Sequence, residues 1–291
     1  MSDASAHPAA PAPRLIVVAG PTAVGKTAYA VKLAQALGTE IVSCDSRQFY
    51  SEMRIGVARP AADELTAVPH HFVACRPVTQ PYNVYDYEQD ALHVLHTLFS
   101  AHDTVVAVGG SGLYIDALCG GISPMPDPTP ELRAELQRMP LDEKRSRLRL
   151  LDPDYYARVD LRNPVRLQRA LEVCLMTGRP YSQVIADRQR GQRPFDIEMR
   201  VLAMERDRLR RRIDDRVDGM MREGLLDEVR SLLPYRHLNT LNTVGYRELF
   251  PVLDGERSLA DAVADIKLHT WHYARKQMTW MRRYAAAAIQ V

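Results

Sequence analysis

The stretch Gly20-Pro21-Thr22-Ala23-Val24-Gly25-Lys26-Thr27 matches the phosphate-binding pattern G-x-x-x-x-G-K-[ST]. An apolar run, residues 15–19, precedes it and is typical of a buried parallel strand. Apolar residues recur behind it at helical spacing, namely Tyr29, Leu33, Ala36 and Leu37. When such a loop joins a strand to a helix, its successive N–H groups and the N-terminus of the helix point at one anion. Lys26 adds a positive charge, and Thr27 offers a hydroxyl to Mg²⁺. We therefore predict a diphosphate or triphosphate site over all eight residues.

Composition narrows the class of protein. The 291 residues carry a formal net charge of +2, so affinity for a polyanion must come from where the basic residues cluster. Four widely spaced cysteines form no zinc or disulfide pattern, which favours a reducing cytoplasm. No apolar run is long enough to cross a membrane. Residues 1–13, rich in Ala and Pro, are predicted to be a disordered tail.

Further strands are expected at residues 40–45, 104–108 and 199–204. Strands that alternate with helices predict a parallel sheet, which binds ligands at the carboxyl ends of its strands. Asp45 and Ser111, each at or just after the end of such a strand, should therefore lie beside the phosphate-binding loop.

A change of composition predicts an insert. Prolines alternate from residue 124 to residue 130, and helical patterns follow to about residue 189. Residues 125–195 contain 14 Lys/Arg and 10 Asp/Glu, a net charge of +4. The expected fold is α/β: a core like that of phosphate-loop NTPases, with a parallel sheet flanked by helices, over 14–124 and 196–291. An all-helical domain is expected over 125–195.

Two later helices carry basic residues whose role the sequence leaves open. Arg208, Arg212 and Arg216 form a stripe, which is either a solvated surface paired with nearby Asp residues or a set directed at the ligand. The last helix, from Ser258 to about Tyr284, interleaves Lys and Arg with aromatic residues. That pattern suits an unstacked nucleotide, or equally a packed core with extended Arg side chains.

The reaction class also stays open at this point. The strand ending at residue 108 leads into Gly109-Gly110-Ser111 and lacks the Asp with which an ATPase holds Mg²⁺. Asp45 is the one carboxylate at a strand end near the loop, and it could position Mg²⁺ or act as a base. Two alternatives remain open: a small-molecule kinase, and an enzyme that transfers a group from a substrate with a diphosphate leaving group.

Several separated motifs occur in order along the chain: Gly20–Thr27, Asp45-Ser46-Arg47-Gln48-Phe49-Tyr50, Pro69-His70-His71, Val108–Tyr114, Arg169-Ala170-Leu171-Glu172-Val173, Val244-Gly245-Tyr246-Arg247-Glu248 and Gln277-Met278-Thr279-Trp280. This ordered set resembles one family, the bacterial tRNA dimethylallyltransferases (tRNA isopentenyltransferases, the MiaA family). The resemblance spans about residues 14 to 284.

The resemblance implies transfer of a dimethylallyl group from dimethylallyl diphosphate to N6 of the adenosine 3′ to certain tRNA anticodons, with Mg²⁺ near Thr27. Lys26, Thr27 and Arg212 would serve the leaving diphosphate, and Asp45 would accept the proton of the amine. Contacts to tRNA are expected from Asp45, Ser46, Arg47, Gln48, Ser111, Arg133, Arg166, Arg169, Arg247, Arg275, Lys276 and Arg282. The partners are then the anticodon stem-loop and dimethylallyl diphosphate, and a monomer suffices.

Some positions depart from the family pattern: Val57, Arg59, Val165 and Trp271 differ from the usual residues, and Arg275-Lys276 reverses the usual order. Val165 and Trp271 put individual tRNA contacts in doubt. Three alternatives remain: a phosphate-loop small-molecule kinase, an isopentenyltransferase acting on free adenine nucleotides, and an RNA-binding module that uses nucleotide as a structural ligand.

Overall fold

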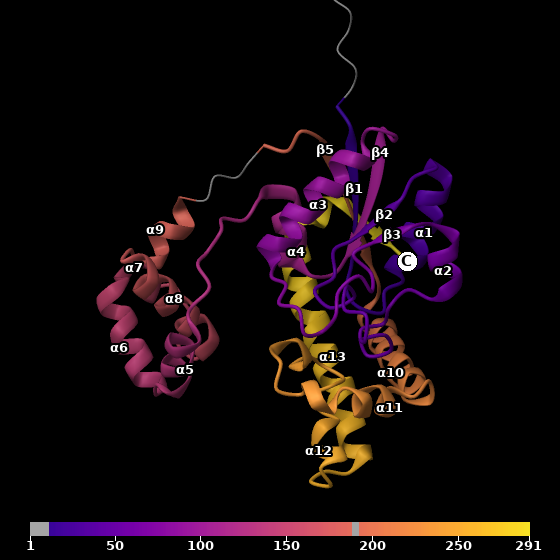
Figure 1. Cartoon of the computed structure of the whole chain (residues 1–291). Coiled ribbons are helices and arrows are strands. Elements are labelled where there is room, and N and C mark those ends of the chain that lie inside the picture. Colours follow the sequence, from indigo (N-terminus) through magenta and orange to yellow (C-terminus); the bar gives the residue numbers. More distant parts are fainter. Residues whose placement is uncertain (1–11, 188–191) are drawn as a thin grey trace, which may run out of the picture. The chain divides into compact units, whose positions relative to one another are not determined.

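A six-stranded parallel sheet lies at the centre of the larger part of the chain (Figure 1). The computed structural model describes residues 12–187 and 192–291. The strand order is β3-β2-β4-β1-β5-β6, and every pairing is parallel. The strands are β1 (Arg14–Ala19), β2 (Ile41–Ser43), β3 (His70–His71), β4 (Thr104–Gly109), β5 (Asp196–Ala203) and β6 (Ala288–Gln290). Because β2, β4 and β1 are neighbours, the loops that follow them leave the sheet at one edge.

Helices pack on both faces of this sheet, and others of the same unit lie away from it (Figure 1). They are α1 (Lys26–Leu37), α2 (Ala62–Ala67), α3 (Val84–Leu98), α4 (Gly112–Gly120), α10 (Arg206–Arg222), α11 (Leu225–Ser231), α12 (Phe250–Leu253) and α13 (Leu259–Met281). Short 3₁₀ turns occupy Leu233–Tyr235, Asn239–Leu241 and Arg282–Ala287. The fold predicted for the core is confirmed.

Strand alternation divides the apolar residues between two cores. Val17 and Val105 face one core, which α3 and α4 complete, whereas Val18 and Val106 face the other, together with α1 and α10. The core face of α1 is formed by its small residues, Ala30, Val31 and Ala34. The predicted face was partly wrong, because Ala36 and Leu37 are exposed at the end of the helix.

The described residues form two compact units, 12–119 with 192–291 and, separately, 120–187. The second unit is all-helical: α5 (Pro130–Arg138), α6 (Leu141–Leu151), α7 (Pro153–Tyr156), α8 (Pro164–Thr177) and α9 (Tyr181–Ala186). Thr129, Asp152 and Asn163 cap three of these helices, each followed by Pro in the first turn. Leu136, Leu148 and Leu167 lie in its own core.

The compact units divide the chain close to the predicted insert boundaries, 125 and 195, at residues 119/120 and 191/192. Arg193 belongs to the first unit, because its guanidinium donates to Leu118 O (2.9 Å) and Ala117 O (2.6 Å) and pairs with Glu88. Phe195 packs on Phe99 in the same unit. The predicted tail, 1–13, lies outside the described residues except for its last two.

Other elements were misjudged at their ends or missed. The strand expected at residues 40–45 is shorter, and the two edge strands β3 and β6, of two and three residues, were not predicted. The last α-helix ends at Met281 rather than Tyr284, which has non-helical φ/ψ. None of the described helices combines the length and apolar character needed to span a membrane.

Candidate functional site

A cavity of about 1110 Å³ lies at the carboxyl edge of the sheet within the first unit. It is lined by the β1–α1 loop, by the segments that follow β2 and β4, and by residues of α10 and α13. The predicted residues that line it are Thr22, Ala23, Gly25, Lys26, Thr27, Asp45, Ser46, Arg47, Gln48 and Arg212. The sheet therefore brings the phosphate-binding loop and the predicted base together.

The phosphate-binding loop has the backbone conformation of an anion site. Gly25 has φ 102° and Ala23 has φ 66°, so the chain turns sharply before α1 begins at Lys26. The first N–H groups of a helix have no intrahelical acceptor, which leaves them free for an anion. Gly20, Pro21 and Val24 of the same loop are buried and are not among the residues that line the cavity.

Positive charge gathers around this loop. Lys26 Nζ donates to Pro21 O at 2.8 Å, and burial, reinforced by the charge of Arg216, lowers the pKa of Lys26 to about 7. The Arg212 guanidinium lies 3.8 Å from the position that a Cβ on Gly25 would take. Arg216 Nη1 donates to the Thr22 hydroxyl at 3.4 Å. Two arginines of the stripe thus face the ligand site, while Arg208 contacts Val291 O elsewhere.

Asp45 is held so that one carboxylate oxygen is engaged within the protein. Its Oδ1 accepts hydrogen bonds from the N–H groups of Arg47 (2.8 Å) and Gln48 (3.2 Å). No described residue donates to Oδ2. Burial raises the pKa of Asp45, while these two hydrogen bonds and the charge of Lys26 oppose the rise. Asp45 is consequently an oriented carboxylate with an oxygen left for a ligand.

Three hydroxyl groups meet beside the cavity, which Ser46 and Tyr273 line but Ser111 does not. Ser111 Oγ lies 3.4 Å from Ser46 Oγ and 3.4 Å from the Tyr273 hydroxyl. Desolvation of its partly covered hydroxyl raises the pKa of Tyr273 to about 12. Ser111 is almost fully buried. The structure thus joins the segments after β2 and β4 to α13.

Gln48 and Arg59 are engaged with the protein backbone. Gln48 Nε2 donates to Ala58 O at 3.0 Å, and its Oε1 accepts from Ser43 Oγ at 3.3 Å. Arg59 Nη2 donates to Met53 O at 2.7 Å and to two more carbonyls of the same loop. These contacts order the cavity wall between residues 48 and 59.

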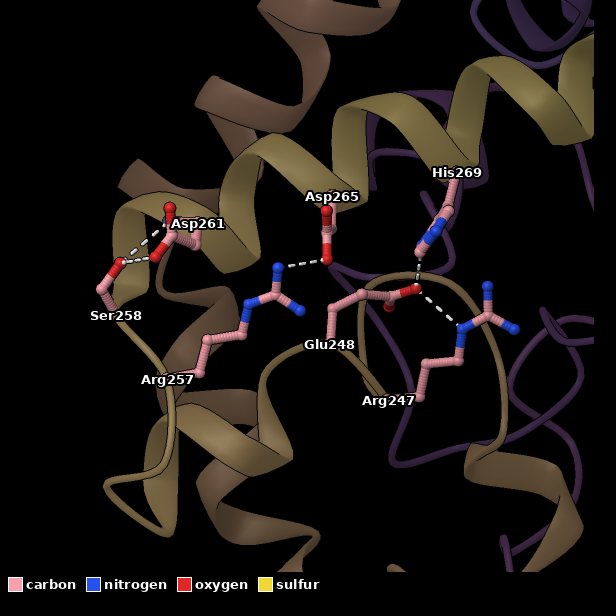
Figure 2. Close-up of polar contacts among 7 residues, drawn as sticks. All are labelled: Arg247, Glu248, Arg257, Ser258, Asp261, Asp265 and His269. Atoms are coloured by element: carbon pink, nitrogen blue, oxygen red, sulfur yellow. Dashed lines mark hydrogen bonds and ion pairs between the residues drawn. The ribbon is translucent and has the colours of Figure 1, made fainter.

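Arg247 and Lys276 line a smaller cavity of about 280 Å³ with His269, His272 and neighbouring residues. Figure 2 shows Glu248 between His269 and Arg247. Its Oε1 accepts from Arg247 Nε and faces His269 Nδ1, both at 2.7 Å, and its Oε2 accepts from Gly245 N at 2.8 Å. Glu248 is buried, so it fixes the wall of this cavity.

The other residues expected to contact tRNA are mostly exposed. Arg275 and Arg282 are exposed in the first unit, and Arg133 and Arg166 in the second. Arg169 is more constrained, since it donates to Pro126 O (3.2 Å) and pairs with Glu172 (3.3 Å).

The two doubtful positions differ in exposure. Val165 is exposed on the second unit. Trp271 is buried, with the guanidinium carbons of Arg206 and Arg210 each 5.4 Å from its ring centroid. For Trp271, the packed-core interpretation is confirmed.

The residues present fit a Mg²⁺ ion that depends on phosphate oxygens for most of its ligands. Thr27 and Asp45 both line the large cavity, and the described residues contain no group of three or more His, Cys, Asp or Glu placed to hold a metal alone. Mg²⁺ commonly takes one or two protein oxygens together with substrate phosphates and water.

Residues 48–284 match the family model described as IPP transferase. The chain belongs to the IPP transferase family. Among curated relatives, tRNA dimethylallyltransferase 1 of Bacteroides thetaiotaomicron is 50% identical over 275 residues, covering 93% of this chain and 89% of the relative. A tRNA dimethylallyltransferase of Christiangramia forsetii is 44% identical, covering 92% and 90%.

Solved structures of related transferases have a fold similar to that of this chain. The full-length tRNA isopentenylpyrophosphate transferase of Bacillus halodurans has a TM-score of 0.69 at 32% identity, covering 96% of this chain and 89% of that one. A eukaryotic dimethylallyltransferase acting on tRNA, 24% identical with a TM-score of 0.76, shares the fold. These IPP transferase relatives support the transferase prediction and not the kinase alternative.

Three residues that line the large cavity had no assigned role in the predicted site: Arg216, named only within a stripe whose role was left open, and Tyr273 and Gln277. Arg216 follows Arg212 by one helical turn, so that spacing was a usable signal. Tyr273 and Gln277 lie far along the chain from the loops that they contact. The alternation of basic and aromatic residues on the last helix did not indicate which side chains would face the cavity.

Proposed function

We propose that this transferase moves a dimethylallyl group from dimethylallyl diphosphate to N6 of the adenosine 3′ to the anticodon in tRNA. The allylic C–O bond breaks and its electron pair leaves with diphosphate. The N6 lone pair forms the new N–C bond, and an N6 proton goes to Asp45. The observation that carries the proposal is the single cavity shared by the phosphate-binding loop, Arg212, Arg216 and Asp45.

On the donor side, the loop Gly20–Thr27 binds diphosphate through its N–H groups. Lys26, Arg212 and Arg216 offset the negative charge that grows as the C–O bond breaks. Mg²⁺ held at Thr27 and by the phosphates would add Lewis-acid stabilisation of the leaving diphosphate. The low pKa of Lys26 fits this role, because a bound anion restores its protonated state.

On the acceptor side, Asp45 orients the amine and receives its proton. An adenine amino group is a weak nucleophile because its lone pair is delocalised, so alignment matters. The two N–H donors to Asp45 Oδ1 support this role, since they leave Oδ2 for N6. Ser46, Ser111 and Tyr273 supply hydroxyls for the entering nucleotide, and Arg47 and Gln48 are proposed to contact it as well.

The tRNA is the proposed macromolecular partner, and the names of the relatives above support it. The anticodon loop is single-stranded, so its adenosine turns out of the stack at low cost. Exposed arginines of the helical unit and of α13 suit its phosphates. We further propose that the protein is a monomer and that it is cytoplasmic; the four unpaired cysteines among the described residues support the second of these proposals.

One assay tests the reaction. The protein, Mg²⁺ and labelled dimethylallyl diphosphate are incubated with unmodified tRNA, with the same tRNA carrying guanosine in place of the target adenosine, with AMP, or with no acceptor. We expect label only in the first reaction. Label in AMP but not in tRNA would indicate an isopentenyltransferase of free nucleotides. Label in no acceptor would reject the proposal.

A further inference from the structure

Gln277 is a buried amide on α13 whose two ends contact different loops. Its Oε1 accepts a hydrogen bond from Thr22 N at 2.8 Å, and its Nε2 donates to Gly110 O at 2.9 Å. Gln277 is 7% exposed; its contact with Gly110 is buried, and its contact with Thr22, at the cavity, is partly buried. A buried amide with both ends satisfied fixes the groups that it joins.

The two loops approach closely at this point. Thr22 lies in the loop after β1, and Gly110 lies in the loop after β4, the neighbouring strand. A Cβ on Gly110 would lie 2.3 Å from Gln277 Nε2 and 3.0 Å from Gly20 O. Only glycine therefore lets the amide reach between them.

The contact at Thr22 acts on the part of the loop that would receive an anion. Ala23, the next residue, has φ 66°, a conformation that a non-glycine residue keeps only when its surroundings hold it there. Gln277 supplies such a constraint directly before it. The hydroxyl of the same Thr22 accepts from Arg216, so a shift of Thr22 would also displace that arginine.

We propose that Gln277 is a positioning residue for the diphosphate: it holds the phosphate-binding loop and the β4–α4 loop in the spacing that receives the leaving group. Tyr273, one turn earlier on α13, approaches Ser111 of the second loop at 3.4 Å. One face of α13 thus orders both the anion site and the hydroxyl groups beside it. The inference rests on the proposed function for its place in the reaction, but not for its effect on diphosphate.

The test measures inorganic diphosphate binding with Mg²⁺ by calorimetry, without tRNA, together with the KM for dimethylallyl diphosphate, kcat, the Kd for tRNA and the Tm. Gln277→Met keeps the length of the side chain and removes both hydrogen bonds. We expect its diphosphate Kd and its donor KM to rise about tenfold, as loss of a well-formed hydrogen bond network requires. The tRNA Kd should stay within about twofold, whereas kcat should fall as well, because the displaced loop also stabilises the charge on the leaving diphosphate.

Gln35→Met is the matched control, because Gln35 is an exposed residue on α1. It should bind diphosphate as the unchanged protein does. Gly110→Ala tests the same contact from the other side, since its new Cβ displaces the amide, and it should also weaken diphosphate binding.

The outcomes separate the two proposals. Gln277→Met with unchanged diphosphate Kd, even at a lower Tm, would overturn the positioning role. So would an unchanged diphosphate Kd in Gly110→Ala. If the unchanged protein transfers no label to tRNA, the proposed function fails, whereas the diphosphate measurements still decide the role of Gln277.

Discussion

Arg216 and Lys26 face the same phosphate-binding loop, and the charge of Arg216 disfavours a second charge on Lys26. Together with burial, the stronger cause, this lowers the pKa of Lys26 to about 7. Asp45 opposes the shift but does not cancel it. The lysine therefore titrates near neutral pH, whereas an exposed lysine would remain charged.

Above pH 7, the protein should take up a proton at Lys26 when it binds diphosphate. At pH 8 a lysine with a pKa near 7 is neutral in about nine of ten molecules, and an anion favours the charged form. We expect uptake of close to one proton at pH 8 and little at pH 6, with affinity falling as pH rises. Calorimetry in buffers of different ionisation enthalpy measures this, with Lys26→Met as the reference for protons taken up by diphosphate itself. Equal uptake in both proteins at pH 8 would disprove it.

Asp45→Asn should retain donor binding but lose turnover. The amide keeps an oxygen for the N–H groups of Arg47 and Gln48 but cannot accept the proton of N6. We expect the single-turnover rate with tRNA to fall by about 10²- to 10⁴-fold, with the diphosphate Kd near that of the unchanged protein. Asp103→Asn, exposed at the opposite end of β4, is the control. A near-normal rate in Asp45→Asn would exclude the carboxylate as base.

Local sequence patterns were sufficient to predict the central sheet and the phosphate-binding loop. Motif, strand and helix are contiguous at residues 14–37, and parallel topology then brings Asp45 to the same edge. Arg212 was assigned to the site by the family resemblance, because the sequence pattern alone left the role of its stripe open.

Long-range contacts account for what was missed. Arg193 belongs to the first unit only because its acceptors, Leu118 O and Ala117 O, end α4 far earlier in the chain. Gln277 bonds to Thr22, 255 positions away, and no local pattern encodes that pairing. The edge strand β3 has two residues, too few for alternation to show.

Arg133 and Arg166 should contribute to the salt dependence of tRNA binding. Both are exposed on the helical unit, and each contact to a phosphate releases counterions. Changing either residue to Gln should reduce the magnitude of the slope of log K for tRNA binding against log salt concentration by about 0.7 to 1. It should weaken the binding of all tRNAs to a similar extent. Arg236→Gln, where the arginine already pairs with Asp254, should leave the slope unchanged. Slopes that match the unchanged protein in both variants would place the tRNA phosphates on other residues.

Glu248 should stabilise the fold mainly because it accepts hydrogen bonds, and less because it carries a negative charge. Glu248→Ala leaves the buried N–H of Gly245 unpaired and removes the partner of Arg247 and His269. We expect the free energy of unfolding to fall by about 1–3 kcal/mol. Glu248→Gln keeps an acceptor oxygen and should lose less. Glu256→Ala, at an exposed site in the same region, should change it by less than about 0.5 kcal/mol. Urea denaturation measures all three, and equal losses in Glu248→Ala and Glu248→Gln would show that the charge, not the acceptor, is what the fold requires.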